Sequence, residues 1–500
     1  MKKNKASSFL FNTFIILISG FFIKLLGLIN RIFITRTLGP ENINLYIMSF
    51  PTIMLFISIS GMSLYVSISK LVAESVKTKQ YSPKIILKKA FLLSISVSVI
   101  TSIIFLILLR PLTHNLLKND DLYFPLLSTL LLIPLVGISD GLKGYFNGLK
   151  MMKFSATANM VEQLARIFFS ITLLLITHPY GPKVATFSCL LAMSIGEVAS
   201  IIYLLIRIKK IGIIHYDNTT GELKAVVDIA VPTTFSRLIG NFTFFLEPII
   251  YVWILSKLCY PHESIEKSYT IVNAYTISLL TIGSFVSIAL STTVVPGISE
   301  NYVIKCFDKV NYYIKKTLIF ALIPGIFITI VLFYFPSDIM KLIYGTTLGT
   351  SDIKLFVFFF LPYYLQAPLV AIYQAMGKSK DLFILSTIFD CLRLLLIVLL
   401  SMVPFISYSS LMIATTITLD LSFIIIFFKV IKLSKLKIDF NQSFSLVLIS
   451  IFIFSLTALL KMIKFPFIIT IIIVGIIYLL CCHLFKLINF KAFFDKNNYK

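Results

Sequence analysis

The sequence predicts an all-α polytopic membrane protein with 14 transmembrane helices, arranged as two six-helix lobes related by an axis along the membrane normal plus two C-terminal helices. Three observations support this fold class. Hydrophobic residues make up 58% of the 500 residues, more than a soluble domain usually contains. Connections rich and poor in Lys and Arg alternate along the chain, and part of the sequence repeats itself.

Apolar runs bounded by charged residues, Gly or Pro define the expected spans, and most are long enough to cross a bilayer. The spans lie near residues 10–34, 43–69, 85–109, 123–145, 156–178, 184–206, 226–255, 269–296, 317–336, 354–376, 382–402, 408–428, 443–460 and 466–485. The first run is too long for the core of a signal peptide and has no small-residue cleavage site, so we expect it to be a retained helix.

The basic residues set the expected topology. Both tails and the even-numbered connections carry thirty of the 45 Lys and Arg residues, the odd-numbered connections carry ten, and five lie within spans. Because Lys and Arg are enriched in cytoplasmic loops, we expect a multi-pass protein of the bacterial cytoplasmic membrane with both termini in the cytoplasm. The net charge of +23 is therefore attributed to topology and not to nucleic-acid binding.

An internal repeat defines the domains. Residues 44–59 and 273–288 are identical at eight of sixteen positions, and residues 22–27 resemble 235–240. Each copy has six helices, an even number, so both copies enter the membrane from the same side. The expected domains are 1–210 (N-terminal lobe), 211–225 (cytoplasmic linker), 226–430 (C-terminal lobe), 443–485 (two extra transmembrane helices) and 486–500 (cytoplasmic tail).

Basic residues inside the spans point to an anionic ligand. Lys24 and Arg31 are seven residues apart and share one helix face, and Arg237 matches Lys24 in the second copy. A charge near the bilayer centre costs about 2.5–3.5 kcal/mol on insertion scales. We therefore expect these residues to line a polar cavity and to bind a phosphate or diphosphate. Two alternatives stay open: Lys24 and Arg31 could reach an interface, and Arg237 with Glu247 could be a structural pair.

Acidic residues inside the spans form a second group of candidates. Glu162 with Arg166, and Asp390 with Arg393, are spaced so that each acid can neutralise its own base. These four residues and Glu247 are expected as charge partners in the cavity, and a purely structural role fits them as well. The candidates for Na⁺ or proton coupling are Asp390 with Ser386, Asp420 with Thr416, and Glu197.

The sequence contains no pattern of an enzyme or of a metal site. The five His residues are scattered, no phosphate-binding loop is present, and the six Cys residues form no CxxC motif. We therefore expect no catalytic residues, no metal and no cofactor. Na⁺, protons or the membrane potential would drive any transport.

Several motifs resemble one known family. Residues 22–27 followed by Arg31, 36–39, Asn44 with Tyr46 and 68–74, and later 161–166, 236–240 and 246–248, are similar to the stage V sporulation protein B group. This is a polysaccharide biosynthesis (MurJ-like) lipid flippase family of the multidrug/oligosaccharidyl-lipid/polysaccharide exporter superfamily. The resemblance covers about the first 430 residues. It implies two lobes around a cavity that opens alternately to each side, with Lys24 and Arg31 on the diphosphate. MurJ-like sequences place the second base six residues after the first, where this chain has Asn30.

The expected function is that of a flippase or exporter. Its cargo would be an undecaprenyl-diphosphate-linked glycan precursor, similar to lipid II and used for spore cortex peptidoglycan. The expected partners are this precursor, membrane lipids and cell-wall synthesis enzymes. Two other functions stay open: a cation-coupled multidrug or small-molecule exporter of the same superfamily, and a non-transporting scaffold for cell-wall synthesis. The excess of bases over acids on the first and seventh spans argues against the drug exporter, because that function needs an acidic cavity.

Overall fold

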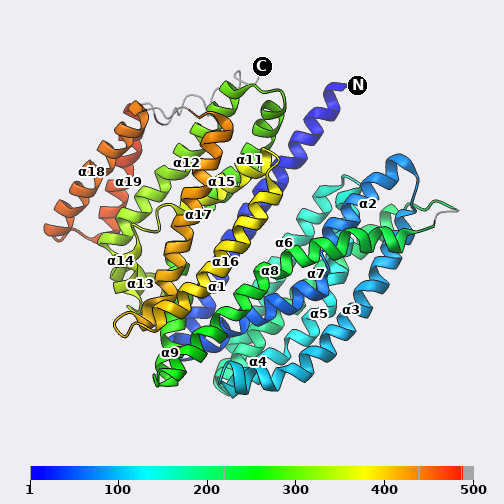
Figure 1. Ribbon diagram of the computed structural model, residues 1–500, viewed down its shortest axis with the longest axis horizontal. Helices are drawn as coiled ribbons and strands as arrows, with labels where there is room; N and C mark the ends of the chain where they lie inside the picture. Colours follow the sequence, from blue (N-terminus) through cyan, green and yellow to red (C-terminus); the bar gives the residue numbers. More distant parts are fainter. Residues whose placement is uncertain (1, 218–219, 437–439, 486, 488–500) are drawn as a thin grey trace. The chain divides into compact units, whose positions relative to one another are not determined.

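A computed structural model of the chain describes residues 2–217, 220–436, 440–485 and 487 (Figure 1). All regular secondary structure in this part of the chain is helical, which confirms the all-α fold class. Backbone contacts divide the chain into two compact units. Unit 1 comprises Met1–Thr270 and Asp390–Leu411, and unit 2 comprises Ile271–Phe389 and Met412–Lys500.

The units follow contacts and do not coincide with the domains expected from the repeat. Residues 226–270, which belong to the expected C-terminal lobe, pack with the N-terminal helices of unit 1, and so does the segment Asp390–Leu411. The repeat boundary near residue 225 is therefore a feature of the sequence and stays a prediction as a domain boundary. The expected tail, residues 486–500, lies outside the described residues apart from Leu487.

Unit 1 is built from long helices joined by short turns. Its helices are α1 (Lys2–Gly61), α2 (Leu64–Thr78), α3 (Pro83–Pro111), α4 (Tyr123–Leu127), α5 (Thr129–Gly148), α6 (Met152–Thr177), α7 (Pro182–Ile211), α8 (Glu222–Lys257), α9 (His262–Thr270) and the second part of α16 (Ser379–Ser401). The short turns are η1 (Leu112–Leu116), η2 (Asp120–Leu122), η3 (His178–Tyr180) and η5 (Ser407–Ser409). α1 kinks at Gly39 (φ 74°, ψ 172°), a conformation that glycine tolerates, directly before Pro40.

Unit 2 has more interrupted helices. Its elements are η4 (Ile271–Thr276), α10 (Ile277–Leu280), α11 (Ser284–Val303), α12 (Phe307–Tyr334), α13 (Pro336–Tyr344), α14 (Thr350–Phe356), α15 (Tyr363–Ala375), the first part of α16, α17 (Ser410–Ser434, whose first two residues belong to unit 1), α18 (Phe440–Met462) and α19 (Phe467–Leu484). Apolar side chains of α11, α12, α15 and α17 form one core, and those of α12, α18 and α19 form another. The Tyr478 hydroxyl of α19 donates to the Ile323 carbonyl of α12 at 3.0 Å.

The number of spans differs from the expected fourteen. In the described part of the chain, eleven helices are long and apolar enough to cross a membrane, or twelve if the bent segment from His262 to Val303 counts as one span. Three expected spans are not separate straight helices. The span near 43–69 continues α1 and crosses into α2, the one near 269–296 breaks between α10 and α11, and the one near 354–376 breaks between α14 and α15. Mean hydropathy depends only on the composition of a segment, so it does not reveal where a helix is interrupted.

Small residues on α5 let α2 approach closely. A Cβ atom on Gly144 would lie 2.8 Å from the Tyr65 carbonyl oxygen, and one on Gly148 would lie 2.6 Å from the Val72 Cβ. Two glycines four residues apart are a common helix–helix contact in membranes, where backbones must pack without help from water. Buried Leu64, Ile68 and Leu142 surround this contact.

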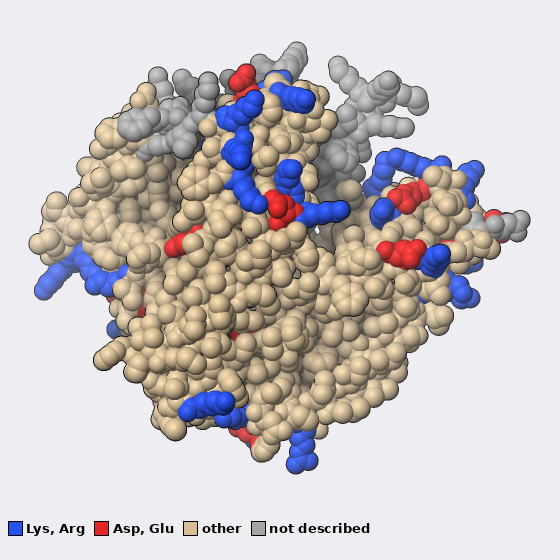
Figure 2. Space-filling view, viewed as in Figure 1, with Lys and Arg blue, Asp and Glu red and all other residues tan. Residues whose placement is uncertain are grey.

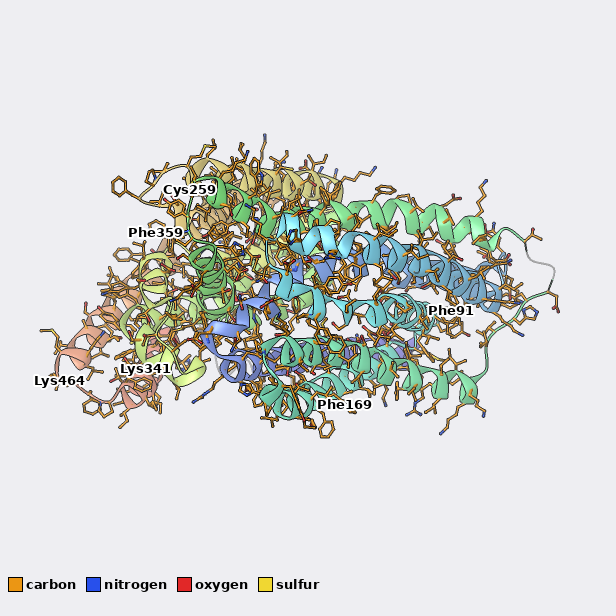
Figure 3. All side chains as sticks on the ribbon, turned by 90° about the horizontal axis from the view of Figure 1, so that it is seen from below. Phe91, Phe169, Cys259, Lys341, Phe359 and Lys464 are labelled. Atoms are coloured by element: carbon orange, nitrogen blue, oxygen red, sulfur yellow. The ribbon has the colours of Figure 1, made fainter. Side chains whose placement is uncertain are left out.

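The surface of unit 1 fits a membrane environment. Phe169 of α6 lies at the outer edge of the unit and is 37% exposed (Figure 3). Lys and Arg side chains gather at the end of unit 1 where α2 ends and α3 and α8 begin, and the face below this end shows few charged residues (Figure 2). Exposed Lys77, Lys79, Lys84 and Lys88 belong to this charged end. The chain is accordingly treated as a multi-pass membrane protein.

Candidate functional site

Four charged side chains from three helices of unit 1 form a buried group, here named the first charge cluster: Lys143 of α5, Glu162 and Arg166 of α6, and Glu197 of α7. The Lys143 ammonium donates to Glu162 Oε2 at 2.6 Å and lies 3.7 Å from Glu197 Oε2. Arg166 donates to the other Glu162 oxygen. The Lys143 side chain is only 7% exposed. With two bases and two acids, the cluster compensates its own buried charge.

Close packing of α6 against α7 holds this cluster together. A Cβ atom on Gly196 would lie 2.8 Å from the Glu162 carbonyl oxygen and 3.2 Å from the Arg166 Cβ. Glycine at this position therefore lets α7 approach α6 closely enough for Glu197 to reach Lys143.

Lys143 is the member that the sequence analysis missed. The expected fourth span, near residues 123–145, ends two residues after Lys143, and the count of basic residues assigns Lys143 to the connection with Lys150 and Lys153 and not to the five bases inside spans. The structure corrects this assignment, since α5 continues to Gly148. One signal was available: Ser139 and Lys143 are one helical turn apart, with Asp140 between them, inside an otherwise apolar run.

A second charge cluster, made of Glu247, Asp390 and Arg393, lies on α8 and α16. The Arg393 guanidinium is 3.4 Å from Glu247 Oε2 and 3.9 Å from Asp390 Oδ1. The Glu247 side chain is 5% exposed and the Asp390 side chain 33%. The expected Asp390–Arg393 pair is thus present. Glu247 pairs with Arg393 and not with Arg237, because ten residues of α8 separate Arg237 from Glu247, a rise of about 15 Å.

The three bases expected on the cavity wall have different surroundings. Lys24 of α1 and Arg237 of α8 have exposed side chains, and no carboxylate in the described part of the chain forms an ion pair with either within 4.0 Å. Arg31 is partly buried and lies, like Arg166, within electrostatic range of Tyr46. Arg237 lies within electrostatic range of Asp140, which also senses Lys143. Their shared cavity stays a prediction.

The α1 face that carries Lys24 has open space at one end and close neighbours at the other. A Cβ atom on Gly20 would meet nothing within 4 Å, whereas one on Gly27 would lie 3.5 Å from Nε2 of Gln163, next to Glu162 of the first charge cluster. Lys24 lies between these two glycines on the same face. This face of α1 therefore runs from open space toward the first charge cluster.

The residues expected to couple ions are placed separately. Glu197 belongs to the first charge cluster and Asp390 to the second. The Ser386 hydroxyl donates to the Phe383 carbonyl, and the Thr416 hydroxyl donates to the Met412 carbonyl. Asp420 of α17 has a buried oxygen, Oδ1, without a hydrogen-bond partner. No group of three or more His, Cys, Asp or Glu residues able to hold a metal ion occurs among the described residues.

Comparisons with known proteins assign the chain to a family. A family model described as polysaccharide biosynthesis protein matches residues 9–302. The chain is 32% identical to stage V sporulation protein B of Bacillus subtilis (strain 168) over 381 residues, which cover 74% of each chain. It is 22% identical to the lipid II flippase MurJ of the same organism over 357 residues, 64% of each chain.

Solved structures support the same fold. A lipid II flippase MurJ in an inward closed conformation aligns with 94% of this chain and 98% of its own length, at a TM-score of 0.69 and 17% identity. An inward-facing multidrug resistance MATE family transporter of the MOP superfamily aligns with 83% of this chain and 96% of its own, at a TM-score of 0.61 and 14% identity. From its family match and its relatives, this chain belongs to the polysaccharide biosynthesis protein family.

Proposed function

We propose that the chain is a flippase that moves a lipid-linked glycan precursor across the cytoplasmic membrane by alternating access, with both termini in the cytoplasm. Its cargo is an undecaprenyl-diphosphate-linked precursor similar to lipid II, used for spore cortex peptidoglycan. Relatives named as a lipid II flippase and as a stage V sporulation protein support this choice of cargo and setting. Cell-wall synthesis enzymes are the proposed protein partners.

One observation carries the proposal. Lys143, Arg166 and Arg393 each have a carboxylate partner within unit 1, whereas Lys24 and Arg237 have none within ion-pair distance in the part of the chain that the structure describes. A Lys and an Arg without a partner inside apolar helices are expensive unless they meet water or an anion. Two exposed bases on helices that open the two sequence repeats therefore suit an anionic cargo, and a diphosphate offers several oxygens to each.

In this proposal, the ions that drive transport bind at residues other than Lys24 and Arg237. Glu197 and Asp420 each have a buried carboxylate oxygen without a hydrogen-bond partner. Protonation relieves the desolvation of such an oxygen, so both residues are proposed as proton carriers. Asp390, with Ser386 one turn before it in the sequence, is the proposed alternative for Na⁺, because carboxylate and hydroxyl oxygens are hard ligands.

The test measures binding and transport of a defined cargo. Purified protein is reconstituted in liposomes with a fluorescent undecaprenyl-diphosphate-linked disaccharide, and its movement between leaflets is followed. We expect Lys24→Gln and Arg237→Gln each to weaken binding about tenfold or more, because each removes charge-assisted hydrogen bonds. Lys153→Gln, which removes an exposed base at the start of α6, is the matched control and should match the unmodified protein.

Two outcomes would reject this function. Unchanged binding and transport in both Lys24→Gln and Arg237→Gln would show that these bases do not contact the cargo. Equal binding of undecaprenyl carriers with and without the diphosphate would show that the anion is not recognised.

A further inference from the structure

A hollow lined mostly by polar residues lies at the end of α3, and none of its lining residues belongs to the two charge clusters. Its volume is about 690 Å³, and its lining includes Arg110, Thr113, His114, Asn115, Asp120 and Tyr123. All of these residues belong to unit 1 and to one stretch of the chain. By the distribution of basic residues, this stretch is expected on the outer side of the membrane.

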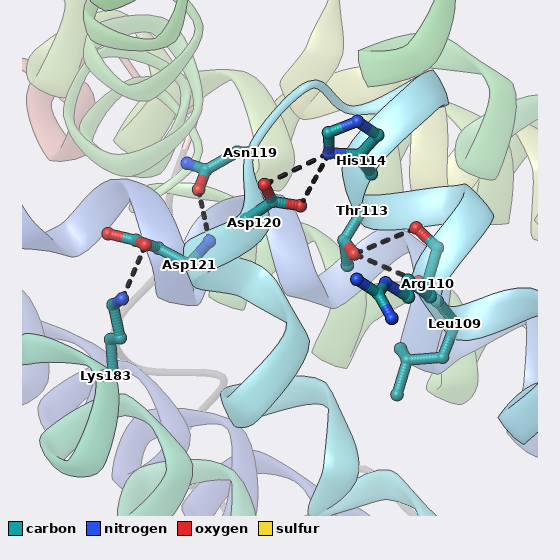
Figure 4. A network of polar contacts seen from close by, with 8 residues as sticks. All are labelled: Leu109, Arg110, Thr113, His114, Asn119, Asp120, Asp121 and Lys183. Carbon is teal, nitrogen blue, oxygen red and sulfur yellow. Dashed lines mark hydrogen bonds and ion pairs between the residues drawn. The ribbon is translucent and has the colours of Figure 1, made fainter.

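The wall formed by α3 is shaped by a local break in the helix. After Pro111 the backbone widens into the π-helical turn η1, and such turns occur frequently at functional sites. The Thr113 hydroxyl bonds to the Leu109 and Arg110 carbonyls at 3.1 and 3.3 Å (Figure 4). These bonds supply partners for carbonyl groups at the break, so the wall is a defined structure and not a frayed end.

The segment that carries the lining residue Asp120 is also held in place by its neighbours. The Asn119 side chain accepts a hydrogen bond from the Asp121 backbone N–H at 2.9 Å and donates one to Glu266 of α9 at 2.5 Å. Asp121 forms an ion pair with Lys183 of α7 at 2.6 Å (Figure 4). Asp120 lies 3.1 Å from Nδ1 of His114. Asp120, which lines the hollow, thus has His114 as its neighbour, and the adjacent Asp121 is paired with Lys183.

Arg110 differs from these acidic residues because it has no charged partner in the described part of the chain. Its side chain is exposed, and among the described residues its guanidinium has no hydrogen bond or ion pair. Residues 90–109 carry no charge and span about 30 Å as a helix, the thickness of the hydrocarbon core. Because Lys89 precedes this stretch and Arg110 follows it, Arg110 lies at the level of the lipid headgroups.

An apolar stripe leads from the membrane core to the hollow. Ile100, Ile103 and Ile107 are 56%, 53% and 67% exposed, and they recur on α3 at the spacing of one helix face. The same spacing continues to Arg110, in the last turn of α3 before the π-helical break. A cation at headgroup level above an exposed apolar stripe is complementary to a phosphate attached to acyl chains.

We propose that this hollow binds a membrane phospholipid. The phosphate pairs with the Arg110 guanidinium, the acyl chains lie along Ile100, Ile103 and Ile107, and the His114–Asp120 pair contacts the rest of the headgroup. The site is separate from Lys24 and Arg237, so the inference does not depend on the proposed transport function. The loop on its far wall is bonded to α9, so an occupied site would stabilise this end of unit 1.

Native mass spectrometry of delipidated full-length protein tests the proposal. The probes are phosphatidylglycerol, phosphatidylethanolamine, diacylglycerol and inorganic phosphate. The variants are Arg110→Gln, Arg110→Lys and, as matched control, Lys118→Gln, which removes an exposed base from the same loop. We expect both phospholipids to bind the unmodified protein and Lys118→Gln equally, and Arg110→Gln about tenfold more weakly. Arg110→Lys should retain most of the binding, because it keeps the charge.

Four results would overturn the proposal. Arg110→Gln could bind phospholipid as the unmodified protein does. Lys118→Gln could lose as much binding as Arg110→Gln, which would indicate a general effect of charge. Diacylglycerol could bind as tightly as phospholipid, which would leave only the apolar stripe. Inorganic phosphate could bind as tightly as phospholipid, which would indicate an anion site and not a lipid site.

Discussion

The two charge clusters of unit 1 share a local motif and differ in how it is completed. Glu162 with Arg166, and Asp390 with Arg393, are matching acid–base pairs in the two sequence copies. In the first charge cluster, α5 contributes Lys143 and α7 contributes Glu197 to this pair. The cluster therefore contains two bases and two acids. In the second, only Glu247 arrives, so a single Arg393 serves two carboxylates.

This difference separates a structural role from a ligand-binding role. A balanced buried cluster has no need of an added ion, and removing any member leaves a charge without compensation. The second charge cluster has one acid more than it has bases, and Asp390 is the more exposed of its two carboxylates. A cation or a proton could therefore join the second cluster without displacing a side chain. We infer that the first cluster mainly stabilises unit 1, with proton uptake confined to the Glu197 oxygen that lacks a hydrogen-bond partner, whereas the second cluster can also take up a cation.

The largest expected effect is at Lys143. Lys143→Met leaves Glu162 and Glu197 buried with less compensation, so we expect a loss of about 3–5 kcal/mol in the free energy of unfolding. Thermal unfolding of purified protein in detergent measures it, with Lys153→Met as the exposed control. The double variant Lys143→Met, Glu197→Gln should recover much of the loss, because it removes the uncompensated carboxylate and leaves Glu162 paired with Arg166. Equal melting of Lys143→Met and the control would contradict the structural role.

The second cluster should respond less strongly to the same kind of change. Arg393→Gln removes the only base, but its two contacts are longer than the one between Lys143 and Glu162, and Asp390 keeps access to solvent. We expect a loss of about 2 kcal/mol, carried by buried Glu247. Adding Glu247→Gln should restore most of it, whereas adding Asp390→Asn should restore little. The same unfolding assay compares the single and double variants, and a loss larger than that of Lys143→Met would reverse the ranking.

Much of this arrangement could be predicted from the sequence, because it depends on local spacing. Apolar runs give the helices, and a base three or four residues after an acid gives the two pairs, which are present as expected. The partners that complete the clusters were not predictable in this way. Glu197 is 54 residues from Lys143 in the chain, and only the packing of α5, α6 and α7 brings them together. Pairing Arg237 with Glu247 failed because it assumed contact within a helix over too long a rise.

Substituting alanine for a glycine beside each cluster should have the smallest effect on the free energy of unfolding. The two substitutions should also show the clearest difference between the clusters. Gly196→Ala places a Cβ atom 2.8 Å from the Glu162 carbonyl oxygen, so α7 must move away from α6 and loosen the first charge cluster. Gly240→Ala places one 3.9 Å from Asp390 Oδ2, an ordinary contact. We expect Gly196→Ala to lower the free energy of unfolding by about 1 kcal/mol. Gly240→Ala should be neutral or slightly stabilising, because alanine favours helix. Thermal unfolding of the two variants side by side measures the contrast. If both behave alike, close packing does not distinguish the balanced cluster from the acidic one, and their difference lies in charge alone.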